Sequence, residues 1–249
     1  MAIFGLLWLA WALPTGQSPQ SVAFQAADRV QVYGTYYPTG DRTRPVVLLF
    51  HQSESNRGEY AQIAPRLVEL GFNALAIDGR VGGPMWGLRN QTYDRLRRVA
   101  GYEEALRDLE AALDWVIQSG HTGPVLAWGS SYSAALVFLL VKGRWAPGGA
   151  GTQAARHPQV AGVLSFSPWE YLWGENTVRE AAAKVRVPVF ITSAKGEAAQ
   201  ARVIFRSVGS SKKVQFVPRR DGRHGSPALD SEDGEEYWQA VRAFLTQFQ

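Results

Sequence analysis

Short apolar runs alternate with amphipathic stretches along most of the chain. The runs are typical of strands that are buried on both faces, and the stretches between them repeat apolar residues with a helical period. The predicted strands cover residues 46–50, 74–77, 125–128, 160–166, 187–192 and 214–217. The predicted helices cover residues 60–70, 102–118, 132–141, 177–184, 197–208 and 236–248. Such alternation indicates an α/β fold whose sheet is mostly parallel, with helices on both faces.

Two further strands, 22–25 and 30–37, precede this alternation and are joined by a polar turn at Ala27 and Asp28. They predict an antiparallel opening pair, which brings the sheet to about eight strands. The sequence contains no long insertion that would form a large lid. Ligands of open parallel sheets bind beyond the carboxyl ends of the strands. We therefore expect the chemistry in residues that directly follow a strand.

Gly129, Ser131 and Ser133 lie between the predicted strand 125–128 and the predicted helix 132–141. They nearly match the nucleophile-elbow pattern G-x-S-x-G, in which small residues let the strand and the helix approach closely. We predict Ser131 as a catalytic nucleophile. Ser130 is the rival, although it lies one position outside the Gly-x-Ser frame. The alternative interpretation is an ordinary polar turn that caps the helix.

A serine hydroxyl is a weak nucleophile and requires an adjacent base. His224 lies in a glycine-rich loop after the last predicted strand and is the predicted base. The acid of such a triad is expected between the serine and the histidine in the chain. Glu197 is the first carboxylate after the strand 187–192, and Glu170 follows the strand 160–166. We predict Glu197 as the acid and keep Glu170 as its rival.

The loop after the strand 46–50 is predicted to supply one backbone N–H of an oxyanion hole, from either Gln52 or Ser53. The second N–H is that of Tyr132, the residue after the nucleophile. His51 is expected to orient this loop rather than to act as a base. Aromatic residues near the site are expected to line an acyl or aryl pocket, with core packing as the alternative. They are Trp86, Trp169 and Trp173.

Composition narrows the functional classes. The 249 residues include no cysteine, which excludes disulfides and thiolate nucleophiles. The net charge of +4 is small and the basic residues are scattered, so nucleic-acid binding is not expected. No pair of histidines has metal-ligand spacing, and neither G-x-G-x-x-G nor the P-loop pattern occurs. We predict no metal and no cofactor.

The first 13 residues are almost wholly apolar and are too short to span a bilayer. They resemble the apolar region of a secretory signal, although no Lys or Arg precedes them. We predict two regions: residues 1–20 as a signal peptide or membrane anchor with a linker, and residues 21–249 as one domain. This predicts a periplasmic or secreted protein; a buried N-terminal helix is the alternative.

These motifs together resemble the α/β-hydrolase superfamily, and in particular the dienelactone-hydrolase-like group of small esterases. The similarity extends from Val22 to the C-terminus; the matching segments are 48–52, 71–80, 129–133, 188–197 and 224–225. Three positions depart from that group. Dienelactone hydrolase has a Cys nucleophile, a Gly usually stands at the position of Gln52, and an Asp usually stands at the position of Glu197.

The resemblance implies a serine hydrolase that cleaves short-chain or aryl carboxylic esters through an acyl-enzyme intermediate. Its expected partner is therefore a small ester substrate. The first alternative is a serine peptidase or acyl-aminopeptidase on the same fold. The second is a catalytically inactive binding protein with the hydrolase fold, because Gln52, Ser133 and Glu197 are non-standard at their motif positions.

Overall fold

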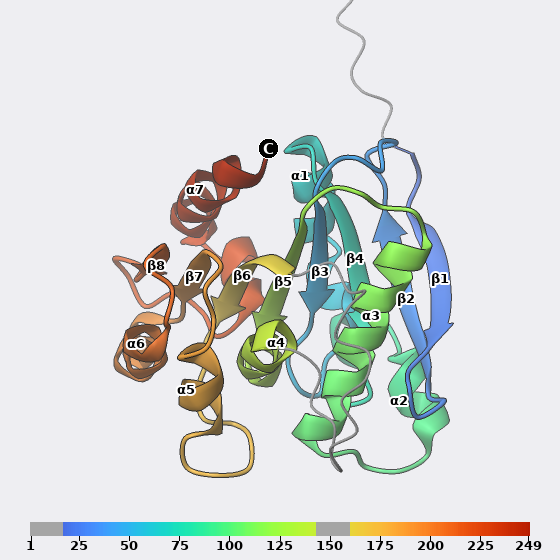
Figure 1. Cartoon of the computed structure of the whole chain (residues 1–249), viewed down its shortest axis with the longest axis horizontal. Helices are drawn as coiled ribbons and strands as arrows, with labels where there is room; N and C mark the ends of the chain where they lie inside the picture. The colour runs from blue at the N-terminus through green and yellow to red at the C-terminus, as the bar shows by residue number, and fades with distance from the viewer. Residues whose placement is uncertain (1–16, 143–159) are drawn as a thin grey trace, which may run out of the picture.

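The computed structural model describes residues 17–142 and 160–249. These residues form one eight-stranded sheet in the order β1-β2-β4-β3-β5-β6-β7-β8 (Figure 1). β1 and β2 are antiparallel to their neighbours, and the remaining strands run parallel to one another. The strands are β1 (Gln20–Gln25), β2 (Gln31–Tyr37), β3 (Val46–Phe50), β4 (Asn73–Asp78), β5 (Val125–Ser130), β6 (Val160–Phe166), β7 (Val189–Thr192) and β8 (Lys213–Phe216).

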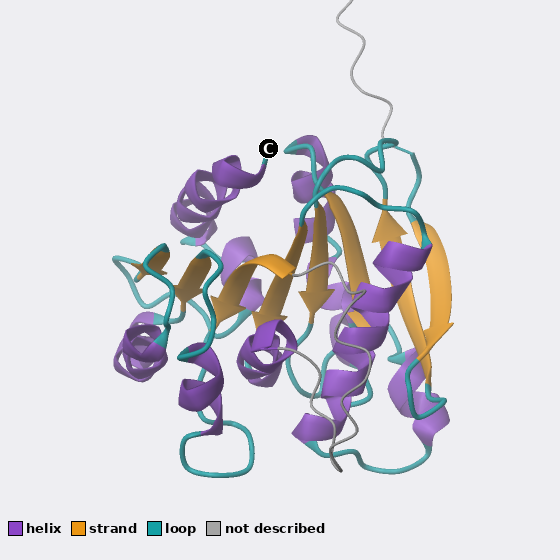
Figure 2. Ribbon diagram, in the orientation of Figure 1, coloured by secondary structure: helices purple, strands orange, loops and turns teal. Residues whose placement is uncertain are grey.

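Helices cover both faces of the sheet (Figure 2). The α-helices are α1 (Ile63–Glu69), α2 (Gln91–Leu96), α3 (Leu106–Gln118), α4 (Tyr132–Lys142), α5 (Thr177–Ala182), α6 (Ala198–Ser207) and α7 (Gly234–Leu245). Short 3-10 turns are η1 (Arg57–Tyr60), η2 (Met85–Gly87), η3 (Tyr102–Ala105), η4 (Lys195–Glu197), η5 (Ser226–Asp230) and η6 (Thr246–Phe248). The α/β prediction, with a mostly parallel sheet of about eight strands, is confirmed. Among residues 17–142 and 160–249, no insertion large enough to form a lid covers the site.

Two apolar cores form because successive strand residues point to opposite faces. In β3, Val46, Leu48 and Phe50 face the core beneath α3 to α6, whereas Val47 and Leu49 face the core beneath α1 and α7. Every residue of β3, β4 and β5 is buried. This double burial explains why the inner strands are continuous apolar runs in the sequence.

The parallel strands bring their carboxyl ends to one edge, and the loops that follow β3, β5, β6, β7 and β8 meet there. These loops hold all three predicted triad residues. The predicted leader, residues 1–13, lies outside the described residues. Among the residues that are described, no helix is both long and apolar enough to cross a membrane.

Candidate active site

Ser131 connects β5 to α4 in a strained backbone conformation. Its φ is +59°, in the left-handed region that non-glycine residues rarely adopt. The Ser131 N–H donates to Phe166 O at 2.8 Å, and its carbonyl accepts the Ala134 N–H at 2.9 Å. The residue is only 7% exposed. A serine held on such a strand-to-helix turn has the geometry of a nucleophile elbow.

The residues two before and two after Ser131 explain how the turn closes. A Cβ on Gly129 would lie 2.3 Å from the carbonyl oxygen of Ser133, so only glycine fits at position 129. Ser133 occupies the second small position and uses its hydroxyl there. The Ser133 Oγ accepts the Ser130 N–H at 2.8 Å and donates to Phe50 O at 2.7 Å. The hydroxyl thus ties the elbow to the end of β3.

Glu197 and His224 are brought together from the loops after β7 and β8. The imidazole Nδ1 lies 2.6 Å from Glu197 Oε1. The Ser167 hydroxyl donates to Oε2 at 2.7 Å, and the Ala194 N–H does so at 3.3 Å. Burial alone would raise the pKa of Glu197, but the hydrogen bonds from His224 and Ser167 outweigh it and hold this pKa below its usual value. The ionised carboxylate assigns the proton to Nδ1 and leaves Nε2 as the basic nitrogen.

Ser167 is a site residue that the sequence analysis missed. It follows β6 directly, has a φ of +57°, and donates its N–H to Thr192 O at 2.7 Å. Its Oγ also accepts the Gly225 N–H at 2.9 Å, next to His224. One side chain therefore fixes both the acid and the histidine loop. The available signal was its place directly after a predicted strand.

The histidine loop is anchored beside the elbow. The Ser226 N–H donates to Ser130 Oγ at 2.9 Å, and Ser130 is fully buried, which removes it as a nucleophile. The Tyr171 phenol donates to Ser167 O at 3.2 Å, and no hydrogen bond within residues 17–142 and 160–249 joins Ser131 Oγ to the His224 ring. Hydrogen bonds between a nucleophile and its base often tighten only when substrate is bound.

The rival acid Glu170 has another structural task. Its carboxylate accepts the backbone N–H of Val178 at 2.8 Å and that of Arg179 at 3.0 Å, at the start of α5. It also pairs with the Arg179 side chain. Glu170 is thereby committed to capping a helix, and Glu197 is the carboxylate that contacts His224.

The loop after β3 places the two predicted oxyanion donors differently. The Gln52 N–H donates to Glu59 Oε2 at 3.1 Å and is therefore turned away from substrate. This leaves the N–H of Ser53 as the remaining candidate from this loop. Tyr132 begins α4, where the first N–H groups of a helix have no intrahelical partner. Its N–H stays available beside Ser131.

His51 is buried and orients this loop, as expected from the sequence. Its Nδ1 lies 2.6 Å from Gln52 O, and its Nε2 accepts the Gly79 N–H at 2.8 Å. Both ring nitrogens are thus committed to the backbone. Burial lowers the pKa of His51, which favours the neutral ring that these two contacts require.

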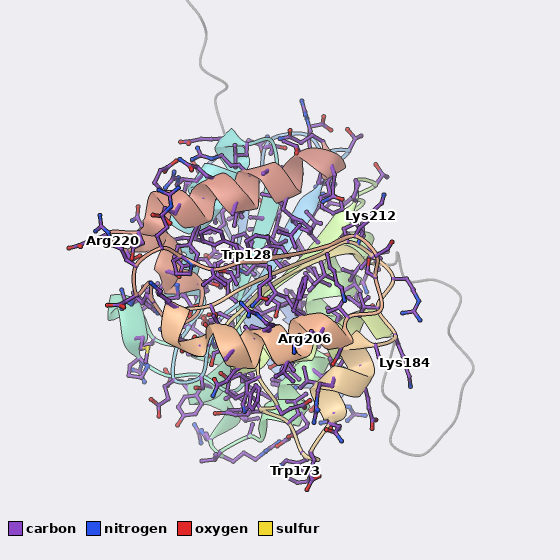
Figure 3. The ribbon with its side chains drawn as sticks, turned by 90° about the vertical axis from the view of Figure 1, so that its left-hand side faces the viewer. Trp128, Trp173, Lys184, Arg206, Lys212 and Arg220 are labelled. Atoms are coloured by element: carbon purple, nitrogen blue, oxygen red, sulfur yellow. The ribbon has the colours of Figure 1, made fainter. Side chains whose placement is uncertain are left out.

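The three predicted pocket tryptophans have different environments. Trp86 donates its indole N–H to Ser55 Oγ at 2.9 Å, and the guanidinium of Arg223 lies 5.8 Å from the centre of its ring. Trp86 thus contacts both the loop after β3 and the histidine loop. Trp169 is half-buried. Trp173 is 84% exposed and projects into solvent at the edge of the molecule, so it does not line an enclosed pocket (Figure 3).

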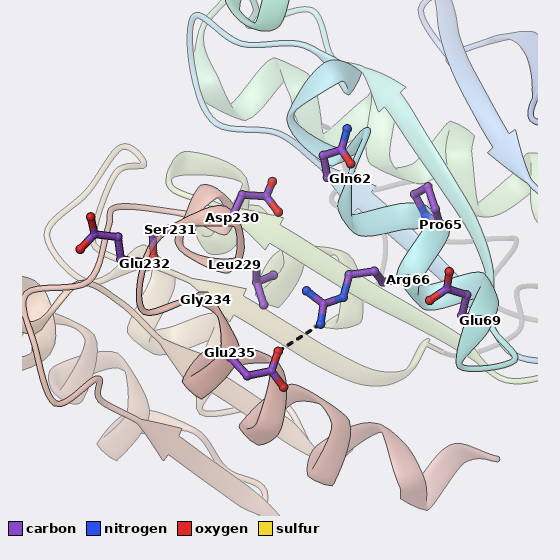
Figure 4. Close-up of a pocket in the computed structure, with 10 residues that line it drawn as sticks. All are labelled: Gln62, Pro65, Arg66, Glu69, Leu229, Asp230, Ser231, Glu232, Gly234 and Glu235. Carbon is purple, nitrogen blue, oxygen red and sulfur yellow. Dashed lines mark hydrogen bonds and ion pairs between the residues drawn. The ribbon is translucent and has the colours of Figure 1, made fainter.

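Two hollows lie on the surface of the described residues. One, of about 400 Å³, borders the loop after β3 and is lined by Glu54, Gly82, Gly83, Pro84, Met85 and Tyr93. The other, of about 570 Å³, lies between α1 and α7, where Arg66 and Glu235 form an ion pair (Figure 4). No triad residue lines either hollow, and the walls of the second carry charges of both signs. Only the first adjoins the loop that carries a candidate oxyanion donor.

Comparisons with known proteins identify the fold. An esterase of Pyrococcus furiosus, Pf2001, is 15% identical over 93% of each chain, with a TM-score of 0.69. Dienelactone hydrolase from Anabaena variabilis is 17% identical over 93% of this chain and 99% of that chain, with a TM-score of 0.66. An acylaminoacyl peptidase of Pyrococcus horikoshii is 12% identical over 94% of this chain and 42% of that chain, with a TM-score of 0.66.

These similarities establish that the chain has the α/β-hydrolase fold. No family model and no curated protein matches the sequence. The fold alone does not specify a reaction, since unrelated functions share it. The chemistry must therefore be argued from the site.

Proposed function

We propose that the chain is a serine hydrolase that cleaves carboxylic esters through an acyl-enzyme intermediate. The observation that carries this proposal is the 2.6 Å contact between Glu197 and His224 Nδ1, at the same sheet edge where Ser131 stands at a φ of +59°. A carboxylate, an imidazole and a strained serine in this chain order form the usual constellation of a triad. Each of them also follows a different strand of the sheet.

In the proposed reaction, Ser131 Oγ attacks the ester carbonyl while His224 Nε2 takes its proton. Glu197 stabilises the imidazolium that forms, and the N–H groups of Tyr132 and Ser53 stabilise the oxyanion. The imidazolium then donates its proton to the departing alcohol, which leaves Ser131 acylated. His224 next removes a proton from water, the hydroxide attacks the acyl carbonyl, and the acid product departs as Ser131 recovers its proton.

We assign short-chain and aryl esters as the substrate class. The hollow of about 400 Å³ beside the loop after β3 is within the size range of small-molecule sites. The indole N–H of Trp86 donates to Ser55 in the same loop, and the partly exposed Trp86 ring offers an apolar surface there. Such a site favours a small acyl or aryl group over the long chains of triglycerides.

The test is a panel of p-nitrophenyl esters, from acetate to laurate, with wild type, Ser131→Ala and Glu170→Gln. We expect turnover to be highest for acetate or butyrate, to fall at least about 10³-fold in Ser131→Ala, and to stay near wild type in Glu170→Gln. Full activity in Ser131→Ala would refute the proposal. Fluorophosphonate labelling of wild type but not of Ser131→Ala would exclude the inactive binding protein, since only an activated serine reacts.

The similarity to the acylaminoacyl peptidase supports a second candidate, hydrolysis of an acylated amino acid. Amide cleavage uses the same three residues, with an amine as the leaving group. Acyl-amino-acid p-nitroanilides run beside the ester panel separate the two candidates. We expect esters to be cleaved at least about 100-fold faster, because an alcohol is a better leaving group than an amine.

We also propose that residues 1–13 direct export or membrane attachment, which agrees with their apolar composition. Fractionation of cells that express the full chain tests this, with a chain lacking residues 1–16 as the control. Recovery of both chains in the same soluble cytoplasmic fraction would contradict the proposal.

A further inference from the structure

A carboxyl group that the triad does not use is buried beneath the loop after β3. Glu59, in the short turn η1, is only 2% exposed. Its Oε2 accepts the Gln52 N–H at 3.1 Å and the Ser55 hydroxyl at 2.9 Å, whereas its Oε1 is buried without a hydrogen-bond partner. Burying a carboxyl group with one unpaired oxygen costs stability, so the position of Glu59 calls for an explanation.

The surroundings of Glu59 connect it to three loops of the site. The Ser130 hydroxyl, one residue before the nucleophile, stabilises its carboxylate and accepts the Ser226 N–H from the histidine loop. Ser55 links it to Trp86, whose indole N–H donates to the same hydroxyl. Glu59 therefore lies at the junction of the elbow, the histidine loop and the loop that carries Ser53.

The hydrogen bond to Gln52 has a direct consequence for the oxyanion hole. An N–H held by a buried carboxylate cannot also bind substrate, so it fixes the orientation of the peptide unit just before Ser53. Ser55 is held from the other side of Ser53 by the same oxygen. The position of the Ser53 N–H is therefore set by two contacts that both end on Glu59 Oε2.

We propose that Glu59 is a positioning residue of the esterase site: it fixes the oxyanion loop through Gln52 and Ser55, and its negative charge supports the imidazolium of His224. This inference rests on the proposed function and adds a residue to its machinery. The titratable groups whose charge acts on Glu59 or is affected by it are His224 from the histidine loop, Tyr60 from η1 and Tyr132 from α4. Both tyrosines stay neutral, because burial raises the pKa of each well above its usual value.

Glu59 changes its charge in a pH range in which activity can be measured. Burial raises its pKa to about 7, although Ser130 and the hydrogen bonds from Gln52 and Ser55 act to lower it. Its charge therefore changes within the range in which a histidine base is studied. Below that pH the group carries a proton, and the support for the imidazolium is lost.

Two variants separate the two parts of the role. Glu59→Gln keeps an oxygen that can accept from Gln52 and Ser55 but removes the charge, whereas Glu59→Ala removes both. We expect Glu59→Ala to lower kcat by about 100-fold with little change in KM, the effect of misplacing one oxyanion donor. We expect Glu59→Gln to recover at least a tenth of the wild-type kcat. Glu170→Gln is the matched control, a carboxylate that caps α5, and should leave kcat unchanged.

The pH profile provides a readout that a purely structural role would not move. For wild type we expect the acid limb of kcat/KM to be steeper than one ionisation over the pH range in which Glu59 gains its proton, since the protonated group lowers the rate without abolishing it. For Glu59→Gln the limb should fit one ionisation. An unchanged limb in Glu59→Gln, or a wild-type kcat in Glu59→Ala, would overturn the inference.

Fluorophosphonate labelling distinguishes this failure from failure of the proposed function. Labelling uses the same serine and oxyanion hole and needs no natural substrate, so we expect it to slow in Glu59→Ala by a similar factor. If wild type neither hydrolyses the esters nor is labelled, the proposed function fails and this inference fails with it. If wild type reacts and Glu59→Ala, folded as judged by its thermal transition, reacts equally fast, only the role of Glu59 is refuted.

Discussion

Replacing Glu197 with glutamine tests whether this residue is the acid of the proposed triad. Glu197 accepts from His224 Nδ1 on one oxygen and from Ser167 and Ala194 on the other. An amide has only one oxygen. If the amide oxygen faces His224, the NH2 group faces the Ala194 N–H, and two donors oppose each other. If the NH2 group faces His224, the ring must accept at Nδ1 and carry its proton on Nε2.

The second orientation disables the base, because a protonated Nε2 cannot take the proton of Ser131. It also removes the charge that stabilises the imidazolium. In the serine-protease triad, the corresponding change from acid to amide lowers kcat by about 10⁴-fold, which is about 5.5 kcal/mol of transition-state stabilisation. Glu197 and His224 are 30% and 38% exposed in their side chains, so water screens part of the charge here. We therefore expect a loss of about 10³-fold in Glu197→Gln, with KM nearly unchanged.

The assay is the initial rate of p-nitrophenyl butyrate hydrolysis, normalised to the concentration of folded protein. Glu170→Gln is the control: it should keep the wild-type rate but lose about 1 kcal/mol of stability, because it weakens the cap of α5. The assignment of the acid would be refuted if the rate of Glu197→Gln lay within threefold of the wild-type rate while Ser131→Ala was inactive.

Two further predictions concern stability. Gly129→Ala should lower the free energy of unfolding by about 3 kcal/mol or more, because the added Cβ meets the Ser133 carbonyl oxygen at 2.3 Å. Gly196→Ala is the control and should change this free energy little, because its Cβ has nothing within 4 Å. Equal urea midpoints for the two variants would contradict the prediction. The second concerns Glu59, whose pKa of about 7 in the folded protein lies above its usual value of 4.5, so the folded state holds a proton that the unfolded state has released. The contribution of this proton to the free energy of unfolding is complete below pH 4.5 and is lost as the pH rises through about 7, a change of about 3 kcal/mol for the difference between those two pKa values. Urea unfolding at several pH values should show that Glu59→Gln removes this dependence of stability on pH. Parallel curves for wild type and variant would contradict the prediction.

The strands were the most predictable part of the fold. Residues 46–50 and 160–166 were predicted with the bounds that β3 and β6 have, because a strand buried on both faces leaves a continuous apolar run. The helix α2 was missed. It has six residues, most of them exposed, and begins at a cap where Asn90 accepts the Tyr93 N–H at 2.8 Å. Nothing in its own periodicity sets it apart from a loop.

Position in the chain also predicted the triad candidates. Ser131, Glu197 and His224 each follow a strand, and parallel strands bring such residues to one edge. Ser167 and Glu59 were missed because their roles depend on which backbone N–H groups face them. The Gly225 N–H reaches Ser167 across 58 positions of the chain. No local pattern in the sequence encodes that contact.

The same physical constraint bears on both choices that the sequence left open. Glu170 and Glu197 each follow a strand, but the N–H groups of α5 occupy the carboxylate of Glu170. Gln52 and Ser53 are neighbours in one loop, but Glu59 occupies the N–H of Gln52. A buried donor or acceptor must be satisfied within the fold, and once it is satisfied it is no longer free for substrate. We infer that the group of each pair that serves the proposed reaction is the one that the fold does not commit elsewhere: Glu197, which contacts His224, and the N–H of Ser53.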